Sequence, residues 1–169
     1  ADHLNKLGHG DRIVRHLDNV VKSEPDHFEA KRLTGRLRVV QGRRGEAAKI
    51  FAELVRLRPD DAAAHASLAD ELMVQKKFAL AVGHYRQALQ LEKKVSAGNG
   101  SAMWANSLAW VLATNPDAKV RNGSEAVEWA RKACDSVENK HPVMLDTLAS
   151  ALAENGQFVE AIKVSKQVL

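Results

Sequence analysis

The chain has 169 residues, of which 45% are hydrophobic but only 5% aromatic, so alanine, leucine and valine fill most of any core. This composition favours closely packed helices over a β-sandwich, which needs more aromatic and β-branched residues. The longest uncharged stretches are interrupted by glycine and asparagine, so we expect no membrane span in this segment. A single cysteine, Cys134, excludes an internal disulfide and a cysteine-rich zinc site.

The net charge of +4 is concentrated in the first third of the chain. Residues 1–60 hold 13 Lys/Arg and 9 Asp/Glu, whereas the remainder is neutral, and the excess lies mainly between Lys31 and Arg44. Such a face attracts an acidic peptide or a nucleic acid, or is simply a solvated helix surface. Because no aromatic residue interrupts the run, nucleic-acid binding is the least favoured of these interpretations.

Residues of similar size recur 34 positions apart along the first half of the chain. The pairs are Pro25 and Pro59, Gly35 and Ala69, Ala47 and Ala81, Phe51 and Tyr85, and Leu57 and Leu91. A glycine or alanine lets two helices approach closely, and the aromatic ring fills the space one turn later. The period therefore predicts a series of packed helix hairpins.

In these positions the chain resembles the tetratricopeptide repeat family, which has the same 34-residue period. The residues that carry the resemblance are Gly35, Gly42, Ala47, Phe51 and Pro59, then Leu68, Ala69, Leu72, Phe78, Ala81, Tyr85 and Ala88, and later Leu145, Leu148, Ala149, Leu152, Gly156, Phe158 and Ala161. The resemblance implies an all-α fold, a right-handed superhelical solenoid of antiparallel helix hairpins. It also implies a non-catalytic protein–protein interaction scaffold.

The predicted units follow one another along the chain. Residues 1–24 are expected to form a partial repeat, with Leu4 and Leu7 in the tail of its first helix and Ile13 and Leu17 in its second. Residues 25–60 and 61–95 are expected to form complete repeats.

Residues 96–140 depart from the period and are predicted to be a variant repeat. From Ala109 to Ala126 is 17 positions, five more than from Ala69 to Ala81. Proline and an Asn-Gly pair between positions 115 and 124 are typical of turns, so we expect an inserted loop between the two helices. Ser101 is expected to cap the first helix, and the unit resembles variant repeats of bacterial members of the family.

Residues 141–169 are predicted to be a C-terminal repeat with no capping helix after it. Both ends are expected to be truncated, because terminal repeats normally need a polar cap. The apolar edge at Ile162, Val168 and Leu169 supports an alternative function, in which terminal or convex surfaces join copies of the protein. Self-association therefore remains open.

No motif predicts catalysis, a cofactor or a metal site. The seven histidines lack the close spacing of a helical zinc motif, and the sequence has neither a phosphate-binding loop nor a nucleophile elbow. Cys134 follows Ala133 in a predicted helix, where a small buried side chain is more common than a reactive thiolate. The sequence therefore predicts a protein that is not an enzyme, and it does not indicate the compartment.

The resemblance implies a concave groove lined by the first helix of each repeat. The groove positions that it assigns are Arg32, Arg36, Val40, Asp70, Met73, Met103, Asn106, Trp110 and Asp146. Arg32 and Arg36 lie one turn apart and are suited to a carboxylate, so the partner is expected to be a protein or peptide with acidic character. Met73, Met103 and Trp110 offer an apolar patch beside them, unless Trp110 packs under the inserted loop instead.

Overall fold

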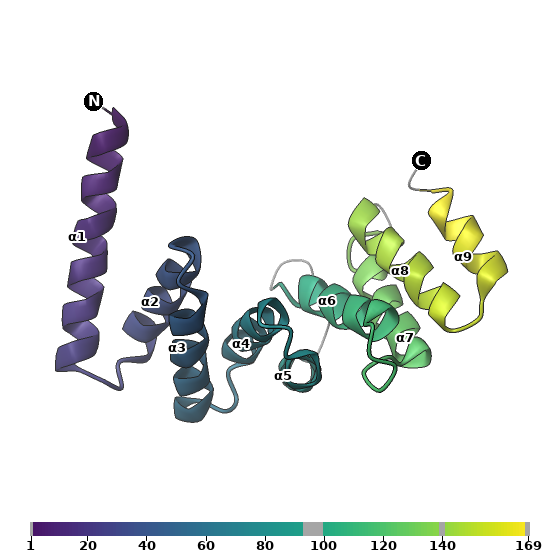
Figure 1. The fold of residues 1–169 in the computed structure, drawn as a ribbon, viewed down its shortest axis with the longest axis horizontal. Coiled ribbons are helices and arrows are strands. Elements are labelled where there is room, and N and C mark those ends of the chain that lie inside the picture. Colours follow the sequence, from purple (N-terminus) through teal and green to yellow (C-terminus); the bar gives the residue numbers. More distant parts are fainter. Residues whose placement is uncertain (1, 93–99, 139–140, 168–169) are drawn as a thin grey trace.

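The computed structural model describes residues 2–92, 100–138 and 141–167, and side chains from residue 12 onward. Within these ranges the chain is entirely helical apart from its turns and loops. The helices are α1 (Asp2–Ser23), α2 (Phe28–Val40), α3 (Arg44–Leu57), α4 (Ala62–Val74), α5 (Phe78–Leu91), α6 (Ser101–Thr114), α7 (Gly123–Asp135), α8 (Pro142–Glu154) and α9 (Phe158–Ser165). They follow one another in a curved row from the N-terminus to the C-terminus (Figure 1). The predicted all-α repeat fold is confirmed.

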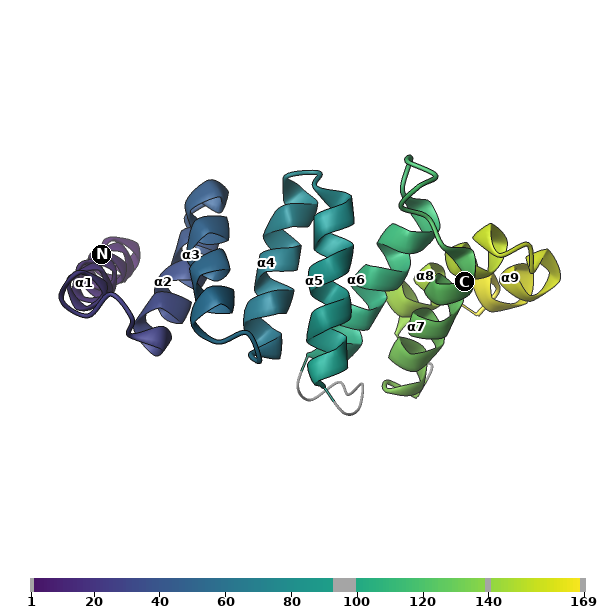
Figure 2. The ribbon, with the colours of Figure 1, turned by 90° about the horizontal axis from the view of Figure 1, so that it is seen from below.

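Three of the hairpins turn through the same tight connection, and their helices lie side by side in the row (Figure 2). Each turn has one residue with a left-handed backbone: Gly42 at φ 74°, Lys76 at φ 59° and Gly156 at φ 77°. Just after it, a backbone N–H returns to the preceding helix, as when Lys77 donates to the carbonyl of Leu72 at 2.9 Å. This arrangement satisfies carbonyls at the helix end and reverses the chain within three residues.

Side-chain caps start several of the helices. The Asp61 carboxylate accepts from the backbone N–H of Ala64 at 2.7 Å at the start of α4, and His27 caps α2 from the position 34 residues earlier. The predicted cap at Ser101 is wrong, because Ser101 is the first residue of α6 itself. Gly100 occupies the cap position, where its left-handed φ of 84° is accessible to glycine without strain.

Small residues set the spacing within each hairpin, as the repeat period predicts. Ala47 and Ala81 are fully buried, and the aromatic residues Phe51 and Tyr85 are 2% and 1% exposed. A Cβ atom added to Gly35 would lie 2.7 Å from the Phe51 ring, so only glycine fits between α2 and α3 without a shift. These contacts belong to one core that runs along the whole stack from α2 to α9.

The N-terminal segment differs from its prediction. Where two helices were expected in residues 1–24, α1 is a single continuous helix from Asp2 to Ser23. Gly8 and Gly10 lie inside this helix. An interior glycine lowers helix stability by only about 1 kcal/mol relative to alanine, and no proline is present in α1 to break the helix. The side chains of Leu4 and Leu7 lie outside the described residues.

The third hairpin has the longer loop that its sequence indicated. Residues 115–122 connect α6 to α7, eight residues where the connections 41–43, 75–77 and 155–157 have three. The difference equals the five residues inferred from the spacing.

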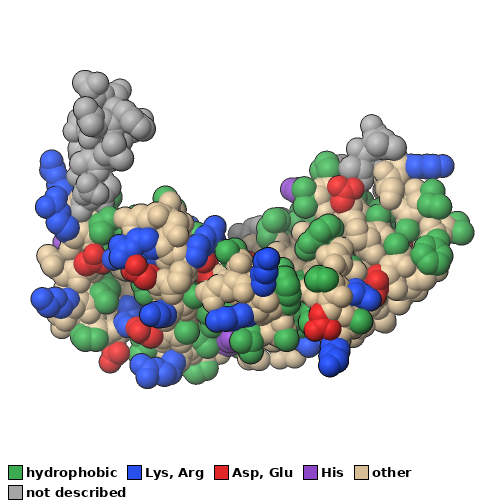
Figure 3. All heavy atoms as spheres, viewed as in Figure 1, with side chains coloured by type: hydrophobic (Ala, Val, Ile, Leu, Met, Phe, Trp, Pro, Cys, Tyr) green, Lys and Arg blue, Asp and Glu red, His purple; other side chains and the backbone are tan. Residues whose placement is uncertain are grey.

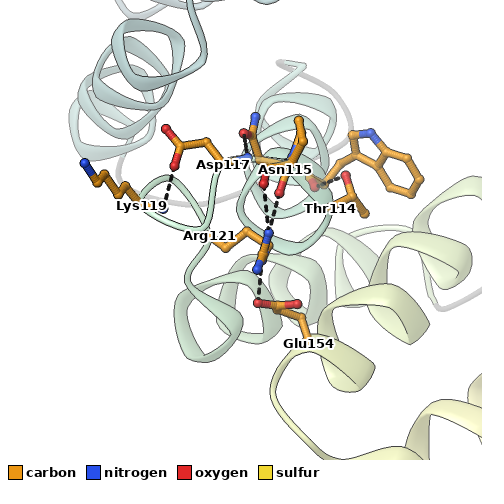
Figure 4. Close-up of polar contacts among 8 residues, drawn as sticks. Thr114, Asn115, Asp117, Lys119, Arg121 and Glu154 are labelled. Carbon is orange, nitrogen blue, oxygen red and sulfur yellow. Dashed lines mark hydrogen bonds and ion pairs between the residues drawn. The ribbon is translucent and has the colours of Figure 1, made fainter.

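Hydrogen bonds hold this loop against the next hairpin (Figure 4). The side-chain oxygen of Asn115 accepts from the backbone N–H of Asp117 at 2.9 Å. The Arg121 guanidinium donates to the carbonyl of Asn115 at 2.8 Å and to Glu154 at the end of α8, also at 2.8 Å. The insertion is therefore pinned through Arg121.

The last helix, α9, ends at Ser165, and Val168 and Leu169 lie outside the described residues. Phe158, Val159 and Ile162 are 64%, 86% and 58% exposed on it, so the predicted apolar edge is present at Ile162. None of the helices described is both long and apolar enough to cross a membrane.

Candidate functional site

A hollow of about 630 Å³ lies in the middle of the stack and is lined mainly by residues of α4, α6 and α8, the first helices of three successive hairpins. Figure 3 shows the upper face of the molecule hollowed between its two ends. The residues that line the hollow are Arg44, Asp70, Met73, Val74, Tyr85, Asn106, Ser107, Trp110, Val143, Asp146 and Thr147. Its volume is within the range of about 300–1,000 Å³ that ligand pockets usually have.

The hollow brings together five of the predicted groove residues from three repeats. They are Asp70, Met73, Asn106, Trp110 and Asp146. Trp110 is 46% exposed, so its ring is open to solvent at the hollow and is not buried under the inserted loop.

The remaining predicted groove residues lie elsewhere. Arg32 and Arg36 line a smaller hollow of about 350 Å³ together with Trp104. Arg36 and Val40 also line an apolar depression of about 490 Å³ between α1 and α2. Met103 is 49% exposed on α6 and is not among the residues that line these three hollows.

Sequence reasoning missed several residues of the central hollow. Tyr85 was interpreted only as the aromatic filler of its repeat, yet its hydroxyl donates to Asp70 at 2.5 Å. The signal was available, because a deeply buried tyrosine needs a hydrogen-bond partner, which the phenylalanine at the matching position does not. Arg44 was missed because it begins the second helix of the preceding repeat, outside the positions that the resemblance assigns to the groove.

The charged groups around the hollow are unevenly paired. Burial raises the pKa of Asp70, and Tyr85 provides its hydrogen bond. Asp146 is exposed, and no ion pair to another described residue involves it. Arg44 donates to Glu71 at 2.8 Å, and this glutamate is 1% exposed. The Arg44 guanidinium is ion-paired with Glu71 and also attracts the Asp70 carboxylate through space, whereas neither Asp70 nor Asp146 forms an ion pair with a described residue.

The basic run between Lys31 and Arg44 is largely neutralised within the chain. Five of its six cations form ion pairs: Lys31 with Glu53, Arg32 with Glu29, Arg38 with Asp18 and Glu46, Arg43 with Glu46, and Arg44 with Glu71. Arg36 is exposed and forms no ion pair with any described residue. The run is therefore mostly a paired helix surface with one available guanidinium.

Few side chains in the described part of the chain are placed to bind a metal ion or to react as nucleophiles. There, no set of three or more His, Cys, Asp or Glu side chains is placed to hold a metal ion. Cys134 is fully buried, and burial raises the pKa of its thiol to about 11, which opposes formation of a thiolate. The Nδ1 atoms of His65 and His84 lie 3.0 Å apart, and His65 also contacts the carbonyl of Pro59 at 3.1 Å.

The curved row of helices, their arrangement in hairpins and the hollow on one side define an α-solenoid. In this class of protein, stacked helix pairs present a long curved surface. The sequence profile of the tetratricopeptide repeat family matches residues 1–62 and 33–96, more than half of the chain. The chain therefore belongs to the tetratricopeptide repeat family, whose fold serves as a non-catalytic scaffold for protein interactions.

Solved structures share this fold along nearly the whole chain. A MamA protein superposes with a TM-score of 0.79 at 19% identity, covering 99% of this chain and 85% of that chain. MamA from Desulfovibrio magneticus RS-1 gives a TM-score of 0.74 at 18% identity, covering 99% and 88%. YrrB, described as a TPR protein with an unusual peptide-binding site, gives 0.77 at 14% identity, covering 99% and 81%. No curated protein matches the chain by sequence.

Proposed function

We propose that this chain is a scaffold that binds an extended peptide segment along the groove formed by α2, α4, α6 and α8. The observation that carries the proposal is the hollow of about 630 Å³, which combines apolar side chains and unpaired polar groups from three successive repeats. An exposed tryptophan in a concave site is a typical binding hot spot. The peptide-binding site in the description of YrrB, a protein of the same fold, adds support.

The groove offers different chemistry at its two ends. Near α2, the exposed guanidinium of Arg36 is available for an acidic side chain of the peptide, whereas Arg32 is paired with Glu29 at 2.6 Å. In the middle, Met73 and Trp110 supply apolar surface. A peptide that spans both regions is held in one direction along the groove, because its ends meet unlike side chains.

The test uses a phage-displayed library of random 12-residue peptides selected against the chain. Synthetic copies of the selected peptides are then measured by fluorescence polarisation with the wild type, Trp110→Ala, Arg36→Ala and Leu80→Ala. Leu80 is a matched control, since it is an apolar residue that is 59% exposed on α5, a second helix outside the central hollow.

We expect Trp110→Ala to weaken binding at least tenfold and Leu80→Ala to leave it within about twofold. That tenfold loss corresponds to about 1.4 kcal/mol. Arg36→Ala is expected to weaken only peptides with an acidic residue near one end. Binding that survives Trp110→Ala but is lost in Leu80→Ala would place the interaction on the convex side and refute the proposal.

Self-association is a second candidate function, and the apolar face of α9 is the observation that favours it. Phe158, Val159 and Ile162 are exposed on a single short helix. If this face joins two copies, light scattering will show a mass that rises with concentration, and the double variant Val159→Glu/Ile162→Glu will remain monomeric. A wild type that is monomeric up to high micromolar concentrations would exclude this function for the chain.

A further inference from the structure

We propose that the central hollow selects a peptide with an arginine or lysine side chain, which enters between Asp70 and Asp146. This inference rests on the proposed function and adds the chemical class of the anchoring residue. It concerns the middle of the groove and is separate from the acidic contact at Arg36. Four features of the hollow lead to it.

The first feature is the placement of two carboxylates on different repeats around one cavity. Asp70 comes from α4 and Asp146 from α8, and both line the same hollow. Tyr85 donates one hydrogen bond to Asp70, and no described cation pairs with either aspartate. Two carboxylates around one concave site favour a cationic ligand, because a guanidinium donates several hydrogen bonds to carboxylate oxygens at once.

The second feature is the state of the cation already present. Arg44 lines the hollow but donates to Glu71 at 2.8 Å. Glu71 is 1% exposed, so removing Arg44 from it would leave a buried carboxylate without compensation. Arg44 is therefore held by Glu71 and attracts Asp70 only through space, so neither aspartate is ion-paired and both can accept hydrogen bonds from a ligand.

The third feature is an unpartnered polar group in the wall of the same hollow. Asn106 is 6% exposed, and its Oδ1 atom has no hydrogen-bond partner among the described residues. A buried acceptor without a donor costs about 1–3 kcal/mol, which a ligand donor recovers. Asn106 lines the hollow together with the two aspartates, so an arginine or lysine head group supplies the donor that its buried Oδ1 atom lacks.

The fourth feature is the apolar surface beside the carboxylates. Trp110 is 46% exposed in the lining, and Met73 and Val74 lie in the same wall. An indole face attracts a guanidinium or ammonium group, and apolar side chains pack against the methylene stem of lysine or arginine. An acidic side chain would gain neither interaction and would face two like charges.

The test continues from the peptides selected on the wild type. A second selection uses the double variant Asp70→Asn/Asp146→Asn, in which Tyr85 still has an oxygen to donate to. The control variant Asp60→Asn/Glu128→Gln removes two exposed negative charges that do not line the hollow, and so corrects for net charge. The strongest wild-type peptide is also synthesised with each arginine replaced in turn by its uncharged analogue citrulline, or each lysine by norleucine.

We expect one arginine or lysine position to dominate the wild-type selection, and its neutral replacement to weaken binding at least tenfold. The Asp70→Asn/Asp146→Asn variant should lose the same factor for the charged peptide and little for the neutral one. The control variant should bind the charged peptide within about twofold of the wild type.

The outcomes separate this inference from the proposed function. Groove-binding peptides that depend on Trp110 but show no cationic preference, or that favour Asp and Glu at the anchor, would overturn the inference alone. Equal loss of the charged and neutral peptides in the aspartate variant would overturn it as well. If no selected peptide depends on Trp110, both the proposed function and this inference fail.

Discussion

The contact between α7 and the end of α8 makes Gly123 a sensitive test of the packing between the third and fourth hairpins. A Cβ atom added at Gly123 would lie 2.8 Å from the backbone nitrogen of Asn155 and 2.9 Å from its Cα. Both are backbone atoms, so no side-chain rotation relieves the overlap. Since Arg121 ties the loop to Glu154 on the same helix end, α7 and α8 cannot separate without losing that contact.

We therefore expect Gly123→Ala to destabilise the chain by about 1–3 kcal/mol, the usual cost of overpacking a tight contact. For a chain of this size that corresponds to a drop in Tm of roughly 2–12 °C, at about 2–4 °C for each kcal/mol. Thermal unfolding is monitored by circular dichroism. It is read at two wavelengths because a repeat stack need not unfold in one step.

Gly45→Ala is the matched control for this substitution. Gly45 also lies in the first turn of a helix, α3, but an added Cβ there meets nothing within 4 Å. Replacing an unhindered helical glycine by alanine stabilises by about 0.4–1 kcal/mol, so Gly45→Ala should raise Tm. If Gly123→Ala also raised Tm, the close approach of α7 to Asn155 would be refuted.

Three further predictions follow from single residues. Lys76→Gly should stabilise the chain by about 0.5–1 kcal/mol in urea unfolding, because Lys76 holds a left-handed φ of 59° where the equivalent turns have glycine; an unchanged midpoint would contradict this. Burial lowers the pKa of His84, with His65 adding to the effect. The unfolded chain therefore binds the proton first, and stability should fall as pH drops through about 6.5; His84→Gln should lose part of that fall, and an identical pH profile would count against it. The buried thiol of Cys134, with its pKa raised to about 11, should react with a thiol reagent at pH 8 only as fast as the chain opens; reaction at the rate of a free thiol would disprove its burial.

The two irregular parts of the chain differ in how well the sequence predicted them. The inserted loop was predictable because Ala109 and Ala126 both belong to the repeat pattern, and their separation counts the extra residues directly. The continuous helix α1 was not, because Gly8 and Gly10 resemble the small residues of a hairpin turn. No sequence signal near these two glycines indicates that the helix continues through them.

The candidate site likewise has a part that the sequence predicted and a part that it did not. The resemblance placed Asp70, Met73, Asn106, Trp110 and Asp146 on first helices, and the structure gathers these five around one hollow. Arg32 was expected to be available to a ligand, but Glu29 one turn earlier pairs with it. Oppositely charged side chains three positions apart lie on the same face of a helix, so this pairing was open to prediction from the sequence.

The sequence by itself determined the helix hairpins, their period and the longer loop, because small residues at 34-residue spacing mark where two helices approach closely and the aromatic residues mark what fills the space beside them. Tertiary structure alone decided which charges remain available. Arg44 on α3 reaches Glu71 on α4 across 27 positions, which depends on how two successive hairpins are rotated against each other. Tyr85 reaches Asp70 across 15 positions, which depends on how α4 and α5 pack within one hairpin. The charge of the central hollow follows from those pairings and not from the composition of any one repeat.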